Sequence, residues 1–158
     1  MSGTGTRATL ALTALGIPFV PHAYGHAAGT SAYGLEAAAA LGVDPLRVLK
    51  TLVATVDGRS VVALVPVSTT LDLKALAAAA GGKRAALAEP AAAERRTGYV
   101  VGGISPLGQR SRLPLYLDAS ALSHPTVFVS GGRRGFDVEL APADLLAATG
   151  GTTAAIAR

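Results

Sequence analysis

The order of apolar and polar residues alternates between helical and strand spacing along the chain. Residues 8–15 place apolar side chains three and four positions apart, which predicts an amphipathic helix. A short extended segment is expected over 19–24. The next helix is predicted over 33–41, with Ser31 as its candidate N-cap and Gly42 as its end.

Residues 48–67 give the clearest β-hairpin signal. The segment 48–56 ends at Asp57-Gly58, a dipeptide that favours a two-residue hairpin turn, and 60–67 is its expected partner. Just before it, Asp44-Pro45 combines an N-cap residue with a first-turn proline, which predicts one short helical turn.

The second half of the chain is predicted to carry more short strands than helices. Thr69 to Asp72 has the pattern of a capping box ahead of a helix that ends at Gly81-Gly82. Strands that dominate the middle and end, with helices between them, predict an α+β fold with a mixed sheet or small barrel. No repeat or long linker divides residues 1–158, which we expect to form one domain. The further expected elements are strands over 84–88, 99–101, 113–118, 126–130 and 136–140, and helices over 90–96 and 144–148.

Composition narrows the possible chemistry. The 158 residues include no cysteine, which excludes a disulfide scaffold, a thiolate zinc site and a cysteine nucleophile. Only four tyrosines and three phenylalanines are present, without tryptophan, so a wide aromatic platform for nucleic-acid bases is not expected. No apolar stretch approaches the roughly 20 residues of a membrane helix, and we expect a soluble, cytoplasmic protein.

The net charge of +4 comes largely from paired basic residues. Paired Lys and Arg in loops can contact phosphates, which supplies sequence-independent affinity for nucleic acid. The same pairs also suit an ordinary solvated surface, so charge permits a nucleic-acid partner without demonstrating one. The pairs are Lys83-Arg84, Arg95-Arg96, Arg110 with Arg112, and Arg133-Arg134.

Lys50 is the most informative single residue. Side chains alternate between the two faces of a strand, so Lys50 shares its face with apolar neighbours over 48–56. A lysine in such a set either extends its amine to solvent at the strand end or meets an anion or carbonyl in a pocket. The pattern leaves both alternatives open.

A glycine pair follows the expected strand at 99–101. Gly102 and Gly103 would let another group approach the backbone closely, and their N–H groups could hold an oxyanion or a phosphate. The structural alternative is a bulge.

The segment 130–137 combines glycines with polar residues. Its glycine-rich turn could bring Ser130 and Asp137 to one cavity, with Arg133 and Arg134 facing phosphate. The structural alternative is an ordinary hairpin loop with a solvated acidic face.

Two histidines, His22 and His26, lie four residues apart. Pro21 and Gly25 make a helix there improbable, so this spacing does not place both rings on one face, and no acidic or cysteine partner is adjacent. We therefore expect no metal site.

Four motifs in their order along the chain resemble the YbaK/EbsC family, closest to its bacterial YbaK branch of Cys-tRNA(Pro) deacylases. These proteins are free-standing relatives of the editing domain inserted in prolyl-tRNA synthetase. The resemblance covers nearly the whole chain and implies a mixed, largely antiparallel barrel-like β-sheet with surrounding helices, without metal or cofactor. The motifs are Val48–Leu52, Leu71–Lys74, Thr97–Gly108 and Val129–Gly135.

The resemblance also implies a set of site residues. Lys50 corresponds to the essential pocket lysine, and the family commonly has phenylalanine where this chain has Tyr33. Arg133 and Arg134 are the expected tRNA contacts. The residues expected to bind the substrate are Tyr24, Tyr33, Thr51, Gly102, Gly103, Ser130 and Asp137, with the two glycines acting through their backbone.

The implied activity is hydrolysis of mischarged Cys-tRNA(Pro) in trans. In the mechanism that the resemblance implies, the substrate's own thiol attacks the ester carbonyl and releases a cyclic thioester, a lyase-like step. The implied partners are tRNA(Pro) and prolyl-tRNA synthetase. The alternatives are a deacylase that uses activated water on Ala- or Ser-charged tRNA, a non-catalytic RNA-binding module, and a small-ligand binding domain.

Overall fold

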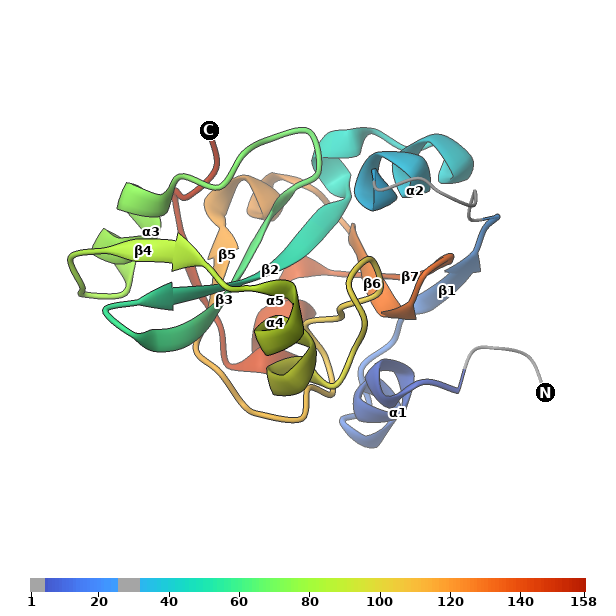
Figure 1. The fold of residues 1–158 in the computed structure, drawn as a ribbon. Coiled ribbons are helices and arrows are strands. Elements are labelled where there is room, and N and C mark those ends of the chain that lie inside the picture. Colours follow the sequence, from blue (N-terminus) through green and yellow to red (C-terminus); the bar gives the residue numbers. More distant parts are fainter. Residues whose placement is uncertain (1–4, 26–31) are drawn as a thin grey trace.

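The computed structural model describes residues 5–25 and 32–158 (Figure 1). Most helices and strands follow one another in the order that the residue pattern predicts; the exceptions are the expected strand at 99–101, which is absent, and a last short strand that was not predicted. The helices are α1 (Arg7–Ala14), α2 (Tyr33–Leu41), α3 (Leu73–Ala79), α4 (Pro90–Thr97) and α5 (Pro142–Thr149), with 3-10 turns η1 (Pro45–Arg47) and η2 (Ala119–Ser123). The strands are β1 (Val20–Ala23), β2 (Leu49–Val56), β3 (Arg59–Pro66), β4 (Ala85–Leu87), β5 (Leu115–Asp118), β6 (Val127–Arg133), β7 (Phe136–Leu140) and β8 (Thr152–Ala154).

The strands form two sheets. The smaller sheet has the order β1-β7-β6 and is antiparallel throughout. The larger sheet has the order β4-β2-β3-β5-β8, in which β2 pairs antiparallel with its neighbours while β3-β5 and β5-β8 are parallel. The expected α+β class with a mixed, largely antiparallel sheet is confirmed. In the described part of the chain the strands do not close into a barrel; a parallel bridge between Val48 and Phe128 connects the sheets.

The β2–β3 hairpin forms as predicted because Asp57 and Gly58 turn the chain. Asp57 has φ 50° and Gly58 has φ 81°, the positive values that a tight hairpin turn requires. The Asp57 carboxylate accepts hydrogen bonds from the backbone N–H groups of Lys83 and Arg84, both at 3.0 Å. This contact fixes the hairpin against the segment that leads into β4.

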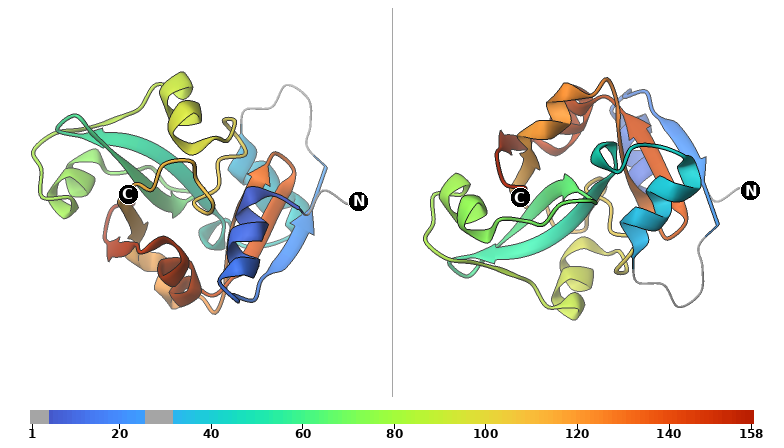
Figure 2. Two further views of the ribbon diagram at one scale, coloured as in Figure 1. Left: turned by 90° about the horizontal axis from the view of Figure 1, so that it is seen from below. Right: turned by 90° about the horizontal axis from the view of Figure 1, so that it is seen from above.

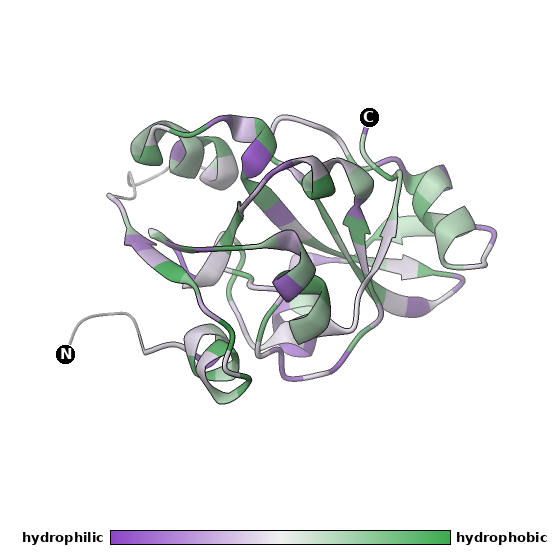
Figure 3. Ribbon diagram, turned by 180° about the vertical axis from the view of Figure 1, so that it is seen from behind, coloured by the Kyte–Doolittle hydropathy of each residue, from purple (hydrophilic) through white to green (hydrophobic). Residues whose placement is uncertain are grey.

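Three apolar clusters hold the layers together. The largest joins α1 and α5 to facing residues of both sheets, and Figure 2 shows α1 lying across β6 and β7. The second lies between the larger sheet and α3, and the third between the smaller sheet and α2. The helices carry both hydrophobic and hydrophilic residues (Figure 3), which agrees with one face packed on a sheet and the other in solvent.

The C-terminal segment is anchored by a buried aspartate. Asp118 is 5% exposed, and its Oδ1 accepts hydrogen bonds from the N–H groups of Ile156 and Ala157 at 2.9 Å. Beyond them, Arg158 and Thr70 exchange two backbone hydrogen bonds of 2.8 Å. The C-terminal segment is thereby paired with the stretch that leads from β3 into α3.

Two local expectations were wrong. The expected strand at 99–101 is a loop, because the Glu94 carboxylate takes up the Val101 N–H (2.9 Å) and the Gly103 N–H closes a turn on Val100 O. The capping box from Thr69 does not form either, because Asp72 itself caps α3 by accepting from Ala75 N.

Candidate functional site

Lys50 lies on β2 at the edge of a cavity. Its face of the strand is apolar as expected, since Leu52, Ala54 and Val56 pack in the cluster under α3. The opposite face is buried as well, because Leu49 and Val53 are 4% and 5% exposed. The start of β2 is therefore covered on both sides, which the alternation alone did not indicate.

The Lys50 amine meets a backbone carbonyl. Nζ donates to Thr69 O at 2.7 Å, and in the described part of the chain that oxygen is the only acceptor it contacts. Burial lowers the pKa of Lys50 from its ordinary value. An ammonium group has three N–H donors, so two remain for a group that enters the cavity.

The cavity has a volume of about 460 Å³. It lies between the start of β2, the first half of α2, the start of α4 and the loop over 101–104. Apolar side chains predominate, and the polar groups are few, which is the usual composition of a small-molecule pocket. Of the predicted site residues, the structure brings together Tyr24, Tyr33, Lys50, Thr51, Gly102, Ser130 and Asp137 in this lining.

Thr51, in the lining of this cavity, has an unsatisfied hydroxyl. Its Oγ1 is buried and has no hydrogen-bond partner in the described residues. An unmade hydrogen bond of a buried hydroxyl costs roughly 1–3 kcal/mol. The fold bears this cost on the strand that carries Lys50.

A nearly buried carboxyl group also lines the cavity. Asp137 is 5% exposed, and it pairs across the β6–β7 ladder with Ser130. Burial raises the pKa of Asp137 to about 7. Burial also raises the pKa of Tyr24, with further contributions from the charges of Asp137 and Glu36. These shifts describe a poorly solvated site in which Asp137 titrates near neutral pH.

Asp137 should make stability depend on pH. Its pKa is about 7 in the folded protein against an ordinary 3.8, so the folded state holds an extra proton between these values. The resulting stability is complete below pH 3.8 and is lost as pH rises to about 7, by up to about 4 kcal/mol. We expect Asp137→Asn to remove this slope in urea unfolding measured between pH 4 and 8.

The exposed Glu89 supplies a matched control for that measurement. Its carboxyl makes no hydrogen bond or ion pair with the described residues, so Glu89→Gln should retain the wild-type pH dependence. An Asp137→Asn variant that still loses stability over the same pH range would assign the titration to another group.

The two predicted glycines occupy different places. Gly102 lines the cavity at φ 91°, and a Cβ there would approach the Tyr33 ring to 2.8 Å. Gly103 lies behind the lining, where a Cβ would come within 2.7 Å of the Arg133 backbone. The sequence predicted that the glycine pair would let another group approach the backbone closely. At Gly103 that group is the loop that carries Arg133.

The two predicted arginines lie outside the lining. Arg134 Nε donates to Val101 O at 2.8 Å, and its guanidinium lies 5.0 Å from the centre of the Tyr33 ring. Arg133 lies over the Phe136 ring at 4.8 Å. Arg134 thus connects the 101–104 loop with the aromatic wall of the cavity.

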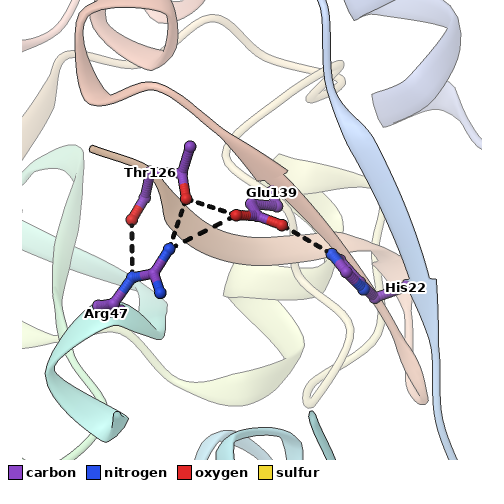
Figure 4. A network of polar contacts seen from close by, with 4 residues as sticks. All are labelled: His22, Arg47, Thr126 and Glu139. Atoms are coloured by element: carbon purple, nitrogen blue, oxygen red, sulfur yellow. Dashed lines mark hydrogen bonds and ion pairs between the residues drawn. The ribbon is translucent and has the colours of Figure 1, made fainter. Parts of the chain in front are cut away.

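A polar network supports the smaller sheet beside η1 (Figure 4). Glu139 Oε1 contacts His22 Nε2 at 2.9 Å, and Oε2 accepts from Thr126 and, at 3.5 Å, from Arg47. The Thr126 hydrogen bond is the main reason that the pKa of Glu139 is lowered. Because η1 leads directly into β2, this network fixes the start of the strand that carries Lys50.

The histidine spacing does not form a metal site among the described residues. His22 is engaged with Glu139, and His26 lies outside the residues that the structure describes. No group of three His, Cys, Asp or Glu side chains with metal-binding geometry occurs in residues 5–25 and 32–158. In the same residues, none of the helices has the length and apolar character to cross a membrane.

Comparison with known proteins identifies the family. Residues 30–148 match the aminoacyl-tRNA editing domain. The chain belongs to this family. It is also 41% identical over 121 residues to EbsC of Enterococcus faecalis, which is provisionally named a Cys-tRNA(Pro)/Cys-tRNA(Cys) deacylase; the match covers 75% of this chain and 73% of EbsC. The resemblance to YbaK/EbsC proteins is thereby confirmed.

Two further comparisons agree with this assignment. The uncharacterised protein YwhH of Bacillus subtilis is 29% identical over 110 residues, which is 70% of either chain. A crystal structure provisionally assigned as a trans-editing enzyme for prolyl-tRNA synthetase superposes with a TM-score of 0.85 at 29% identity. That match covers 100% of this chain and 99% of the other, so the editing-domain fold extends over the chain.

Sequence reasoning missed several parts of the site. Thr69 is the partner of Lys50, but nothing in a turn after a strand marks its carbonyl for that role. Gly34 lets α2 pack on Val67, where a Cβ would come within 2.2 Å of the valine side chain. A glycine in the first turn of a predicted helix was the available signal, since such a residue often marks close packing.

Proposed function

We propose that this editing domain hydrolyses mischarged Cys-tRNA(Pro) in trans. The observation that carries the proposal is Lys50 in the cavity lining, with an ammonium group that makes one hydrogen bond, to Thr69 O, among the described residues. Such a group stabilises the negative charge that develops on an ester carbonyl oxygen when the carbonyl is attacked. The relation to EbsC and to a trans-editing enzyme supports the substrate class.

The nucleophile in this proposal is the thiol of the substrate. Its sulfur attacks the ester carbonyl carbon, the bond to the ribose oxygen breaks, and that oxygen leaves with the proton. Free tRNA and a cyclic thioester result, and water then opens the thioester to cysteine. The chain itself has no cysteine, so its residues need only hold the ester in a reactive geometry and stabilise the oxyanion.

Each site residue has a place in this scheme. Lys50 stabilises the oxyanion, and Thr51 lies next to it in the cavity lining. Tyr24 and Tyr33 form walls, while Ser130 and Asp137 face the amino-acid end. Arg133 and Arg134 contact the tRNA backbone with the N–H groups that remain after their internal contacts. The Gly102 backbone borders the ester, and Gly103 lets the two loops approach each other.

One observation favours a second candidate, the hydrolysis of Ala- or Ser-charged tRNA by activated water. A carboxyl group whose pKa is about 7, such as Asp137, is well matched to accept a proton from water at neutral pH. In that mechanism Asp137 is a general base and the side chain of the substrate plays no chemical part.

The proposed partners follow from the substrate. They are tRNA(Pro) with a wrong amino acid and prolyl-tRNA synthetase, which would supply affinity that four dispersed basic pairs do not. We place the reaction in the cytoplasm, with translation.

A deacylation assay with three forms of tRNA(Pro) tests the substrate assignment. We expect rapid release from Cys-tRNA(Pro) and none above background from Ala-tRNA(Pro) or Pro-tRNA(Pro), because in the proposed mechanism an ester without a thiol has no nucleophile. Measurements with and without prolyl-tRNA synthetase show whether it contributes. Equal cleavage of the Ala and Cys esters would favour the activated-water mechanism.

A further inference from the structure

The loop over 98–108 carries Gly102 to the cavity, and its base is held by a residue far away in the chain. Arg7, the first residue of α1, donates from Nε and Nη2 to Gly108 O at 3.1 and 2.8 Å. Nη2 also lies 3.4 Å from Thr97 O. One guanidinium group therefore contacts the residues at which the loop leaves and enters the body of the protein.

The packing around Arg7 restricts the loop further. The guanidinium lies 5.3 Å from the centre of the Tyr99 ring, and Tyr99 Oη donates to Leu107 O across the loop. A Cβ on Gly98 would come within 2.4 Å of Arg7 Nη1, and a Cβ on Gly108 within 2.6 Å of Arg7 O. The two glycines that bound the loop therefore leave room for this one arginine.

Thr6, the residue before Arg7, contacts the glycine-rich segment 130–137. Thr6 Oγ1 donates to Gly131 O, and Thr6 also caps α1 through reciprocal hydrogen bonds with Thr9. A Cβ on Gly132 would lie 3.0 Å from the Tyr99 ring and 3.2 Å from Thr6 Cβ. The start of α1 thereby contacts both loops whose residues border the cavity.

We infer that Arg7 is a positioning residue for the editing reaction: it fixes the base of the 98–108 loop, so that Gly102 borders the aminoacyl ester. Arg7 does not line the cavity and lies outside residues 30–148, which match the family. This role rests on the proposed function, because it gives the loop a part in deacylation. Lysine cannot replace arginine here, because a single ammonium has neither the planar fork nor the flat face that contacts Tyr99.

The first experiment measures the loop without tRNA. Hydrogen exchange followed by mass spectrometry should show the amides of 98–108 exchanging at least about 10-fold faster in Arg7→Ala than in the wild type. Exchange in β3 should not change. Arg59→Ala is the matched control, since Arg59 is an exposed arginine at the hairpin tip whose side chain makes no hydrogen bond or ion pair among the described residues. Unchanged exchange over 98–108 would overturn the inference.

The second experiment separates positioning from tRNA binding. We expect Arg7→Ala to lower kcat on Cys-tRNA(Pro) about 10-fold while KM and the slope of log affinity against log salt stay as in the wild type. Arg7→Lys should remain several-fold below wild type in kcat, and it replaces Arg7→Ala if the latter proves too unstable. Weaker tRNA binding with a smaller salt slope, restored by lysine, would instead make Arg7 a phosphate contact.

The two readouts also separate this inference from the proposed function. Suppose that the wild-type protein does not cleave Cys-tRNA(Pro) but Arg7→Ala still speeds amide exchange over 98–108. The substrate assignment is then wrong, while the conclusion that Arg7 fixes the loop is upheld. The kcat comparison is then made on the aminoacyl-tRNA that the wild type does cleave, where an unchanged kcat would overturn the positioning role.

Discussion

Replacing Lys50 by alanine should lower deacylation by at least about 100-fold while the protein stays folded. A preorganised donor aimed at a developing oxyanion is worth about 10² to 10³ in kcat, and Lys50 is the cationic side chain in the cavity lining of the described residues. Removal of the amine also removes the cost of burying it. The free energy of unfolding should therefore change by only about 1 kcal/mol.

Two variants sharpen this test. Lys50→Met keeps the apolar stem of the side chain without the charge, and should lose as much activity as alanine. Lys74→Ala removes an exposed lysine on α3 and should retain full activity. Burial lowers the pKa of Lys50. Activity that needs the ammonium form should therefore decline at a lower pH than it would with a lysine of ordinary pKa. A folded Lys50→Ala protein with wild-type turnover would show that Lys50 does not stabilise the oxyanion.

The strength of the Lys50 prediction depends on how the structure resolves an ambiguity in the sequence. The pattern of β2 left two alternatives, an amine in solvent at the strand end or one engaged in a pocket. The contact between Nζ and Thr69 O, together with the cavity, favours the second. Periodicity could not decide this, because the acceptor lies 19 residues away and belongs to a turn without side-chain signal.

Local chemistry explains why most of the fold could be predicted. Asp57-Gly58 turns the chain, Asp44 caps η1, and Gly42 and Gly98 end helices in the left-handed conformation. Each of these residues sets the backbone conformation within a few positions of itself, through its own residue type. The element boundaries that depend on them agree with the structure to within two or three residues.

The failures have other causes. Residues 99–101 are apolar enough for a strand, but the Glu94 carboxylate satisfies the Val101 N–H, so no strand partner is needed. The short strand β8 was not predicted, since it depends on pairing with β5, whose Tyr116 lies 36 positions before its partner Thr152. Long-range contacts of this kind are not visible in local periodicity.

The candidate site also divides into residues that the sequence predicted and contacts that only the structure shows. Motifs shared with a known family supplied the residues Lys50, Thr51, Ser130 and Asp137, which the structure brings to one cavity. The support behind that cavity came only from the structure. Arg7 contacts a loop about a hundred positions away, and neither its spacing nor its neighbours indicate such a contact.

The chemistry itself should discriminate cysteine from serine at the tRNA end. The two substrates differ by one atom, and both side chains lie close to the ester carbonyl. A thiol ionises near pH 8.5 and is intrinsically a strong nucleophile, whereas a hydroxyl needs a general base to attack at neutral pH. If the substrate supplies the nucleophile, Cys-tRNA(Pro) should be cleaved at least about 100-fold faster than Ser-tRNA(Pro). Single-turnover deacylation at saturating enzyme measures this difference without a contribution from binding.

Blocking the sulfur and changing Asp137 complete the argument. S-methylation of the cysteinyl ester keeps its size and polarity near those of the substrate but removes the nucleophile, so cleavage should fall to the uncatalysed rate. Asp137→Asn should keep a substantial part of the activity toward Cys-tRNA(Pro), because no water has to be deprotonated in the attacking step. Activated water predicts the opposite on each count: similar rates for the cysteinyl, seryl and S-methyl esters, and loss of all three when Asp137 can no longer accept a proton. That outcome would identify Asp137, whose pKa of about 7 suits a general base, as the centre of the reaction.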